Sequence, residues 1–297
     1  MSDKRIAIKY TNSNDDTIYF GDEAPFVYLT QAGLDTMSAS PSLVKAPYQI
    51  GKTSFGNIIN ERTITITFAV IAEDEETSEN RRRQIIKAFN PTLSGTLEIF
   101  TNTGDKAAYG CEVTSTPKFT DSDYSTSMQY IMQGQVSMIV PEAFLSDLSE
   151  TFFTLNRVVA LFEFPFEVEL NDTFEVGTLT FGGVYYENTG DCETPLIAEI
   201  KGPVKAPKLI NSTTGEYIKV NIPIAANEKL IINTSFTNKQ VILEKDDGTK
   251  TNAFNYIDLN STFFRLNVGM NHIEFDAEEG NDTANVDIYF KRRWTGI

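Results

Sequence analysis

The sequence contains very little cysteine and histidine. Among 297 residues there are two cysteines, Cys111 and Cys192, and one histidine, His272. Two cysteines cannot form a disulfide framework or close a four-ligand zinc site by themselves, so we expect free thiols. Any histidine-dependent hydrolytic site would need His272, and no G-x-S-x-G segment supplies a serine nucleophile. Because His272 lies in a strand pattern, we expect it to be a structural or surface residue.

A long apolar run and an excess of positive charge are missing as well. No stretch approaches the ~20 apolar residues that a membrane-spanning helix needs. The first residues lead into an alternating strand pattern without an apolar signal-peptide core, which predicts a protein made in the cytoplasm that stays there or leaves by another route such as cell lysis. The formal net charge is −16. This charge argues against nucleic acid and anionic membranes as partners, since both attract basic surfaces.

Three short segments resemble functional motifs but lack the residues that the motifs require. Gly51-Lys52-Thr53 resembles the end of a phosphate-binding loop, but Ala46 stands where the first glycine is needed. Ser42-Leu43-Val44-Lys45 matches S-x-x-K without its companion motifs. Asp121-Ser122-Asp123 begins like a calcium loop, but Met132 occupies the position of the closing glutamate. We expect ordinary loop or turn residues in all three segments.

Three charged clusters are similarly ambiguous. Glu163, Glu167 and Glu169 alternate with phenylalanines, so they fit the solvated face of a strand better than a glycosidase acid pair. Arg81-Arg82-Arg83 is flanked by acidic residues, which favours a solvated or interface-facing helix surface over nucleic-acid binding. The same interpretation holds for Lys291-Arg292-Arg293-Trp294. The sequence therefore predicts no catalytic, cofactor-binding or metal-binding residue.

The first half of the chain shows strand patterns and one helix. Residues 62–72 form the clearest strand, with apolar side chains alternating with threonines. Asp74 is a plausible N-cap for a helix over 75–89, which begins with acidic residues and ends at Asn90-Pro91. Residues 31–60 are rich in Gly, Ser, Pro and Asn and predict a long, functional loop.

Further strands are expected over 96–101, 109–115 and 128–140. The last of these, Met128–Val140, has a long apolar face that could be core or part of an intersubunit seam. A polar break begins at Pro141, which predicts two domains, 1–142 and 143–297.

The second half predicts a β-sandwich without a helix. Short strand patterns recur at sandwich spacing, and Asp247-Gly248 is a good hairpin turn. The segment 162–170 contains Pro165, which predicts an edge or bulged strand. The other expected strands are 178–186, 196–201, 217–222, 229–234, 240–244, 263–266, 272–275 and 285–290.

The order of these pieces resembles one protein family. In the first half the matching segments are Gln49-Ile50-Gly51, Glu61–Thr65, Arg82-Arg83, Phe89-Asn90-Pro91, Tyr109-Gly110-Cys111 and Val140–Phe144. In the second half they are Asn188–Asp191, Glu193–Pro195, Lys201–Pro203, Asn211–Tyr217, Leu230–Thr234, Ser261–Leu266, Gly269–Asn271 and Tyr289–Trp294. Together they resemble the distal tail proteins of siphophages that infect Gram-positive hosts. One departure is Ile50-Gly51, where the family loop usually carries Asp-Gly.

The resemblance implies a mainly β fold and a structural, non-enzymatic role. The first domain would be a belt-type β-sandwich with one α-helix and an extended arm, and the second a galectin-like β-sandwich. Six copies would form a ring, singly or as two stacked rings, at the tip of the virion tail. The implied partners are the tail tube protein, the tail-tip protein and a receptor-binding protein. Ring contacts by strand addition would use the Met128–Val140 edge or the 31–60 segment.

Two alternative functions follow from other features of the sequence. The second domain could bind host cell-wall sugars directly, with Tyr185, Tyr186, Tyr217 or Trp294 stacking on sugar rings. The chain could also be a wall hydrolase, but it lacks histidine chemistry and a clear acid pair.

Overall fold

The structure is a computed structural model that describes residues 6–121, 130–155, 183–281 and 284–297. Met128 and the segment with Glu163, Glu167 and Glu169 lie outside the described residues. The chain divides into two compact units, one formed by 1–149 with 293–297 and the other by 150–292. This division lies a few residues after the boundary predicted at 142, and it places the last five residues in the first unit.

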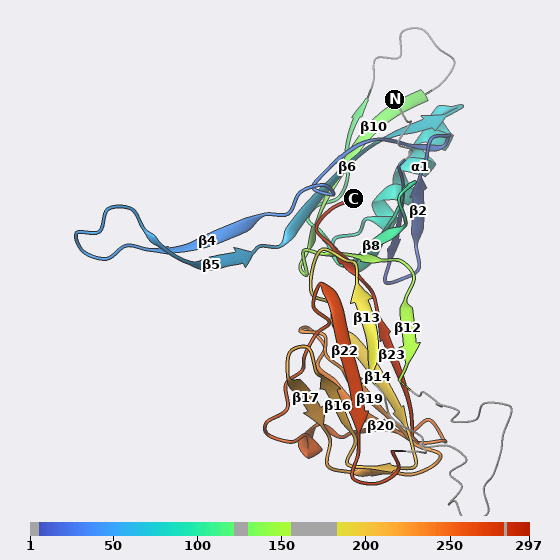
Figure 1. Cartoon of the computed structure of the whole chain (residues 1–297). Helices are drawn as coiled ribbons and strands as arrows, with labels where there is room; N and C mark the ends of the chain where they lie inside the picture. The colour runs from blue at the N-terminus through green and yellow to red at the C-terminus, as the bar shows by residue number, and fades with distance from the viewer. Residues whose placement is uncertain (1–5, 122–129, 156–182, 282–283) are drawn as a thin grey trace, which may run out of the picture. The chain divides into compact units, whose positions relative to one another are not determined.

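The fold class predicted from the sequence is confirmed. The chain is mainly β, and its described residues contain one α-helix, α1 (Glu75–Ala88), and one 3-10 helix, η1 (Phe254–Tyr256) (Figure 1). Each unit buries its own hydrophobic core, and no buried residue belongs to both cores. The two units therefore have the organisation of separate β domains.

Unit 1 is built from one ten-stranded sheet. Seven strands follow the order β2-β1-β7-β8-β10-β6-β3, and β9, β11 and β24 pair beside this path. The two ends of the path meet where Gly21, just after β2, bridges Val27 of β3, so the sheet curls around its own core. The strands are β1 (Ala7–Asn12), β2 (Thr17–Phe20), β3 (Phe26–Ala32), β6 (Arg62–Ala72), β7 (Ser94–Phe100), β8 (Lys106–Val113), β9 (Lys118–Asp121), β10 (Tyr130–Val140), β11 (Leu145–Asp147) and β24 (Arg293–Trp294).

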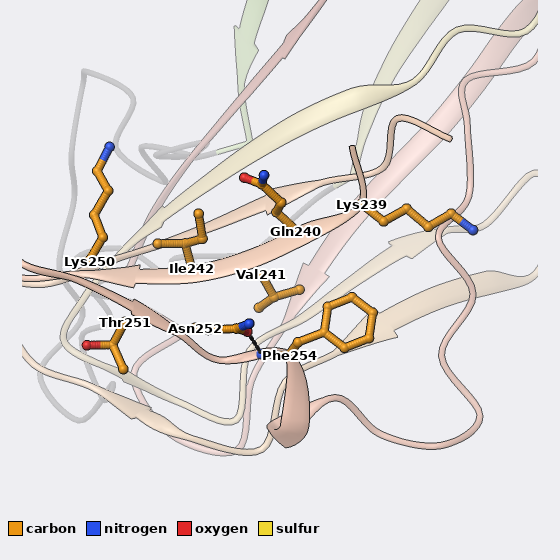
Figure 2. Close-up of a pocket in the computed structure, with 8 residues that line it drawn as sticks. All are labelled: Lys239, Gln240, Val241, Ile242, Lys250, Thr251, Asn252 and Phe254. Atoms are coloured by element: carbon orange, nitrogen blue, oxygen red, sulfur yellow. Dashed lines mark hydrogen bonds between the residues drawn. The ribbon is translucent and has the colours of Figure 1, made fainter. Parts of the chain in front are cut away.

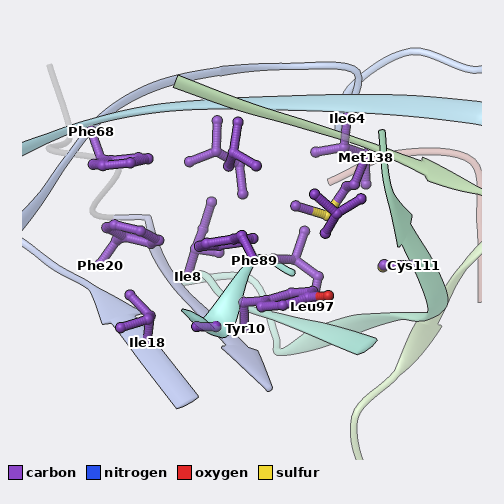
Figure 3. Packing of buried hydrophobic residues seen from close by; sticks show 14 of the residues in the cluster. Ile8, Tyr10, Ile18, Phe20, Ile64, Phe68, Phe89, Leu97, Cys111 and Met138 are labelled. Carbon is purple, nitrogen blue, oxygen red and sulfur yellow. The ribbon is translucent and has the colours of Figure 1, made fainter. Parts of the chain in front are cut away.

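Alternation along β6 fixes which side chains enter the core of unit 1. Ile64, Ile66 and Phe68 are all fully buried, while the threonines between them face the other side. Aromatic rings fill much of the remaining space (Figure 3). The Phe68 ring stacks on that of Phe20 with centroids 4.6 Å apart, and Tyr10 stacks on Phe89 at 4.4 Å. These stacked pairs stabilise the packing beyond the area that they bury.

The helix α1 begins and ends as its sequence predicts. The Thr77 backbone N–H donates to Asp74 Oδ1 at 2.6 Å, which makes Asp74 the N-cap. At the other end the Phe89 backbone N–H donates to the Ile85 carbonyl oxygen at 2.9 Å. Ile85, Ala88 and Phe89 are buried, so the last turn anchors the helix to the sheet.

The strand β10 is not the open edge that the sequence suggested. It pairs with β6 along its whole length, and on its other side with β9 over residues 132–135 and with β8 at 138–139. Because both sides are hydrogen-bonded over much of the strand, β10 cannot accept a neighbour's strand along this length. Strand addition by a neighbouring copy along residues 132–135 and 138–139 of the expected Met128–Val140 edge is therefore wrong.

The last residues of the chain complete unit 1. The strand β24 pairs with β11, with Leu145 opposite Trp294. The Trp294 indole Nε1–H donates to Asp147 at 2.7 Å, and Arg293 forms an ion pair with Glu142 at 2.9 Å. These contacts bring the C-terminal segment into the sheet formed by residues far earlier in the chain.

Unit 2 is a sandwich of two antiparallel sheets. One has the order β12-β23-β14-β19-β20-β21 and the other β13-β22-β16-β17, and both supply residues to one core. A two-stranded pair, β15-β18, lies beside them. The strands are β12 (Thr151–Thr154), β13 (Val184–Asn188), β14 (Leu196–Lys201), β15 (Val204–Lys205), β16 (Lys208–Asn211), β17 (Glu216–Lys219), β18 (Pro223–Ile224), β19 (Lys229–Asn233), β20 (Gln240–Glu244), β21 (Lys250–Asn252), β22 (Gly269–Asp276) and β23 (Asn285–Phe290).

Most of the strands predicted in this half are present. The predictions for 196–201, 240–244 and 285–290 match β14, β20 and β23. Asp247 and Gly248 form the turn between β20 and β21, and Gly248 has the positive φ of 79° that such a turn favours. Residues 263–266 do not form a strand, because Leu266 makes only a single bridge to Thr194. Phe264 and Leu266 are buried nonetheless, so the apolar pattern marks core residues in a non-strand segment.

Candidate functional site

The segment 31–60 contains a projecting β-hairpin. The strand β4 (Ala39–Val44) pairs with β5 (Thr53–Ile59), and together they form the arm, defined as Ala39–Ile59 (Figure 1). Every residue of β5 is exposed, as is nearly every residue of β4. The predicted arm is therefore present, and it has regular secondary structure where the sequence suggested a loop.

The arm exposes a large apolar surface. Tyr48 and Ile50 at its tip are fully exposed. The other large apolar side chains exposed on the arm are Leu43, Val44, Phe55, Ile58 and Ile59. An isolated two-stranded hairpin is marginally stable in water, and soluble monomers rarely expose contiguous apolar surface of this kind. The arm therefore has the composition of a docking element.

The charge of the arm differs in sign from that of the chain. Lys45 and Lys52 are its only charged residues, so its formal charge is +2 while the whole chain carries −16. The rest of the chain therefore carries −18. An apolar, cationic element is complementary to an acidic surface.

Unit 2 contains an open groove at the edge of its six-stranded sheet. The groove has a volume of about 320 Å³ and lies along β20 and β21, next to η1 (Figure 2). Asn252 Oδ1 accepts a hydrogen bond from the Phe254 backbone N–H at 2.9 Å, which sets the start of η1 and the position of the Phe254 ring. The lining residues are Lys239, Gln240, Val241, Ile242, Lys250, Thr251, Asn252 and Phe254.

The histidine and two of the tyrosines considered in the sequence analysis contact other side chains of unit 2. His272 lies on β22, where its ring stacks on Tyr185 at 4.2 Å and its Nδ1 is 3.2 Å from Glu274. Tyr186 stacks on Phe153. Tyr185 is the most exposed of the proposed sugar-stacking residues, but it lies apart from the groove lining.

The remaining two stacking candidates also have contacts of their own. Tyr217 lies beneath the Lys208 ammonium at 4.4 Å, and its hydroxyl is 3.3 Å from Asp258. Trp294 belongs to unit 1, where it binds Asp147. The structure therefore does not bring the four predicted aromatic residues together as one site.

The short motif-like segments lie on the arm or on surface elements. Ser42 and Lys45 lie on or next to β4, and Gly51-Lys52-Thr53 leads into β5, so no helix follows to hold a phosphate. Asp121 ends β9, and its companions in the calcium-like motif lie outside the described residues.

The arginines of α1 contact unit 1 itself. Arg81 donates to the Ile71 carbonyl oxygen, and the Arg82 guanidinium lies 5.0 Å from the centre of the Phe119 ring. Both cysteines are free thiols, as predicted, with Cys111 buried and Cys192 partly exposed.

The described residues show neither a metal-binding cluster nor a membrane-spanning helix. In this part of the chain no three His, Cys, Asp or Glu side chains gather closely enough to hold a metal ion. None of the helices described has the length and apolar character needed to cross a membrane.

The sequence did not single out the apolar residues of the arm or the lining of the groove. A detectable signal for the arm was the group Tyr48, Ile50, Phe55, Ile58 and Ile59 within a segment otherwise typical of a loop. The groove has no such signal, because Gln240, Asn252 and Phe254 are ordinary residues of a strand, a strand end and a short helix.

Comparison with known protein families assigns both units. Residues 15–140 match the phage tail protein RIFT-related domain, and residues 189–294 match the C-terminal domain of the siphovirus-type tail component. No curated protein sequence matches the chain significantly.

Solved structures share the fold over nearly the whole chain. The chain is similar to the Dit protein of phage SPP1, described as a paradigm of the hub adsorption apparatus in phages that infect Gram-positive bacteria. That match has 12% identity and a TM-score of 0.62 and covers 96% of this chain and 98% of that one. A chain of the phage P2 baseplate in its activated conformation with Ca matches at 11% identity and a TM-score of 0.55, covering 99% and 100%. The same baseplate with Sr gives 12% identity, a TM-score of 0.54 and full coverage of both chains.

The residues matched by the two family models correspond closely to the two units of the structure. The two family matches together extend over well over half of the chain. The first lies within unit 1, and the second lies within unit 2 except for its last two residues, 293–294. The chain belongs to the distal tail protein family of siphophages.

Proposed function

We propose that six copies of this chain close into a ring that forms the hub of a phage baseplate. The arm is the observation that carries this proposal. It exposes seven large apolar side chains and has an opposite charge to the rest of the chain. A heterologous contact, in which the arm of one copy lies on a different surface of the next, closes into a ring when the rotation between copies is right.

The ring would connect the tail tube to the tail tip. Its partners would be the tail tube protein on one side, a tail-tip protein on the other and receptor-binding proteins at the rim, at the distal end of the virion tail. The family of the chain and the baseplate origin of the P2 match support this placement. The role is structural and requires no catalysis, and two rings can stack if their faces are complementary.

The first test is the mass of the purified protein in solution. Light scattering at two concentrations, with negative-stain images of the same samples, should show a hexamer or double hexamer with a central hole. Should the protein remain a monomer both alone and with its tail tube protein, the ring proposal is wrong.

A pair of variants tests the role of the arm. We expect Ile50→Ser, at the arm tip, to weaken assembly because it removes exposed apolar surface that the contact would bury. Leu259→Ser is the matched control, because Leu259 is equally exposed but lies in unit 2. Both variants should keep the stability of the isolated chain. Assembly that responds equally to the two changes would exclude a specific contact through the arm.

A further inference from the structure

The groove of unit 2 has a distinctive electrostatic character. None of its eight lining residues carries a carboxylate, whereas Lys239 and Lys250 carry ammonium groups. The whole chain has 41 acidic residues and 25 basic ones. A lining without acids in so acidic a chain favours a negatively charged ligand over a positively charged one.

Aromatic rings position the first of these cations. The Lys239 ammonium lies 5.6 Å from the centre of the Phe236 ring and 5.5 Å from that of Phe263. No carboxylate of the described chain pairs with Lys239, although many of the other lysines form ion pairs. Two cation–π contacts hold the ammonium while leaving its N–H donors available for an anion.

Lys250 has a shared partner. Its ammonium is 3.4 Å from Glu244, and Glu244 also lies 3.5 Å from Lys229. Lys229 has a second carboxylate partner, Glu199, at 3.5 Å, so two carboxylates balance Lys229 and Lys250. The positive charge that no carboxylate of the described chain balances along the groove therefore lies at Lys239.

The rest of the lining is suited to a ring with hydroxyl groups. The Phe254 ring stacks on Phe263 with centroids 5.6 Å apart, so one of its faces is packed and fixed. Phe254 is still 42% exposed, which leaves apolar ring surface beside the groove. The Asn252 Oδ1 is engaged by Phe254, but its Nδ2–H groups have no acceptor in the described chain. Gln240 and Thr251 add further groups that can donate to or accept from hydroxyls.

We propose that this groove binds an anionic saccharide, a sugar unit that carries a carboxylate or phosphate. Its C–H face would pack on Phe254, its hydroxyls would bond with Asn252, Gln240 or Thr251, and its negative group would lie near Lys239. The volume of about 320 Å³ is at the lower end of the usual range for ligand sites, roughly 300–1,000 Å³, which suits one or two sugar rings. This activity goes beyond the proposed hub role, and it uses none of the aromatic residues that the sequence suggested for sugar stacking.

Calorimetric titration of the full-length protein tests the proposal. The probes are α-1,4-linked trigalacturonate and its neutral counterpart, α-1,4-galactotriose, and glucose 6-phosphate compared with inorganic phosphate. We expect the anionic sugars to bind at least about tenfold more tightly than galactotriose and inorganic phosphate. Binding should weaken as NaCl rises from low to high concentration, because the contact is partly exposed to solvent. Comparison of trigalacturonate with glucose 6-phosphate shows which negative group the groove prefers.

Three variants locate the binding. Lys239→Gln should weaken trigalacturonate binding about fivefold, which corresponds to the ~1 kcal/mol of an exposed ion pair. Phe254→Leu keeps apolar volume but removes the ring, and it should weaken all sugars alike. Lys208→Gln is the matched control, because Lys208 also lies over an aromatic ring in unit 2, at 4.4 Å from the Tyr217 centroid, but not in the groove. It should leave binding unchanged.

Several results would overturn the proposal. These are no heat from any sugar at millimolar concentration, equal binding of trigalacturonate and galactotriose, or equal binding of glucose 6-phosphate and inorganic phosphate. Equal loss in Lys239→Gln and Lys208→Gln would show a general charge effect instead of a site. Loss of binding in Phe254→Leu supports the site only if the thermal midpoint of this variant matches that of the unaltered protein. Unchanged binding in both Lys239→Gln and Phe254→Leu would show that the sugar binds elsewhere.

Discussion

The Arg62 guanidinium donates a hydrogen bond of 2.6 Å to the Thr295 carbonyl oxygen, joining two residues 233 positions apart in the sequence. The same side chain donates to the carbonyl oxygens of Ala143, Gly33 and Leu34 at 2.6, 3.1 and 2.9 Å. Arg62 is buried, and its burial lowers the pKa of the guanidinium below its ordinary value. Four carbonyl oxygens thus accept hydrogen bonds from this charged group, and the Arg62 guanidinium holds three backbone segments together at one point.

Replacement of Arg62 should destabilise unit 1. Arg62→Met keeps much of the side-chain volume but leaves four carbonyl oxygens without this donor, which we expect to cost about 3 kcal/mol of unfolding free energy. Denaturant unfolding followed by fluorescence measures this, because Trp294 is the only tryptophan and lies in unit 1. Arg83→Ala, on the exposed side of α1, is the control. A loss of less than 0.5 kcal/mol in Arg62→Met, within the usual range for surface changes, would contradict the proposed role.

Deletion of residues 293–297 should loosen unit 1 without unfolding unit 2. It removes the β24–β11 pairing and the contacts of Trp294 and Arg293. Cys111 supplies the measurement, because burial raises the pKa of its thiol to about 12 and keeps it unreactive in the folded state. In the unaltered protein a thiol reagent at pH 8 should modify Cys192 and spare Cys111. In the deletion variant Cys111 should react as well, with Cys192 as the internal standard, and protection equal to that in the full chain would refute the prediction.

A methyl group at Gly134 should strain the core. Gly134 on β10 pairs with Phe68 on β6, and a Cβ at Gly134 would lie 2.3 Å from Phe68 Cε2. The Phe68 ring is held by its stack on Phe20, so it cannot move away freely. We expect Gly134→Ala to cost about 1–3 kcal/mol of unfolding free energy. The penalty should shrink when Phe68→Leu is also present, and an equal penalty in both backgrounds would show that the ring is not its cause.

The N-cap of α1 should contribute a pH-dependent stabilisation. The Thr77 backbone N–H, with a further hydrogen bond from the Thr77 side chain, holds the pKa of the Asp74 carboxyl below its ordinary value. A group whose folded-state pKa is lowered stabilises the fold above its unfolded-state pKa, and this stabilisation is lost as pH falls through the folded-state pKa. Asp74→Asn keeps a capping oxygen but does not titrate.

The measurement for this cap is the thermal midpoint of unit 1 at pH 7 and pH 3. All other carboxyl groups are shared by the two proteins, so their contributions cancel in the comparison. We expect the thermal midpoint of the unaltered protein to fall further between pH 7 and pH 3 than that of Asp74→Asn. Equal decreases in the two proteins would show that Asp74 does not stabilise the folded helix through its charge.

Local patterns were sufficient to predict the parts of the fold that depend on local physics. The alternation of Ile64, Ile66 and Phe68 determines a buried strand face, and Asp74 with Asn90-Pro91 determines where a helix begins and ends. The Asp247-Gly248 turn is likewise encoded by its two residues.

Which strands pair with one another was harder to predict, because pairing depends on segments that are distant in the sequence. The alternation along residues 130–140 indicates a buried face, but it carries no information on which strands lie at either side. The arm was predicted as a loop because Pro41 and Gly56 are typical of loops and interrupt its strands. The groove depends on three elements that meet only in the folded unit, so a single-sequence pattern could not identify it.

The chain returns to unit 1 after unit 2, and this connection allows unit 2 to be replaced as a whole. The first and last strands of unit 2, β12 and β23, are paired neighbours, with Thr151 opposite Phe290. Paired residues in an antiparallel sheet lie about 5 Å apart, so the chain enters and leaves unit 2 at nearly the same point. Unit 2 is thus inserted into unit 1 with its two ends close together. A short linker could join those ends in place of unit 2 without distorting unit 1. Such a cassette can be exchanged for another module by a single genetic event while the strands of unit 1 keep their pairing.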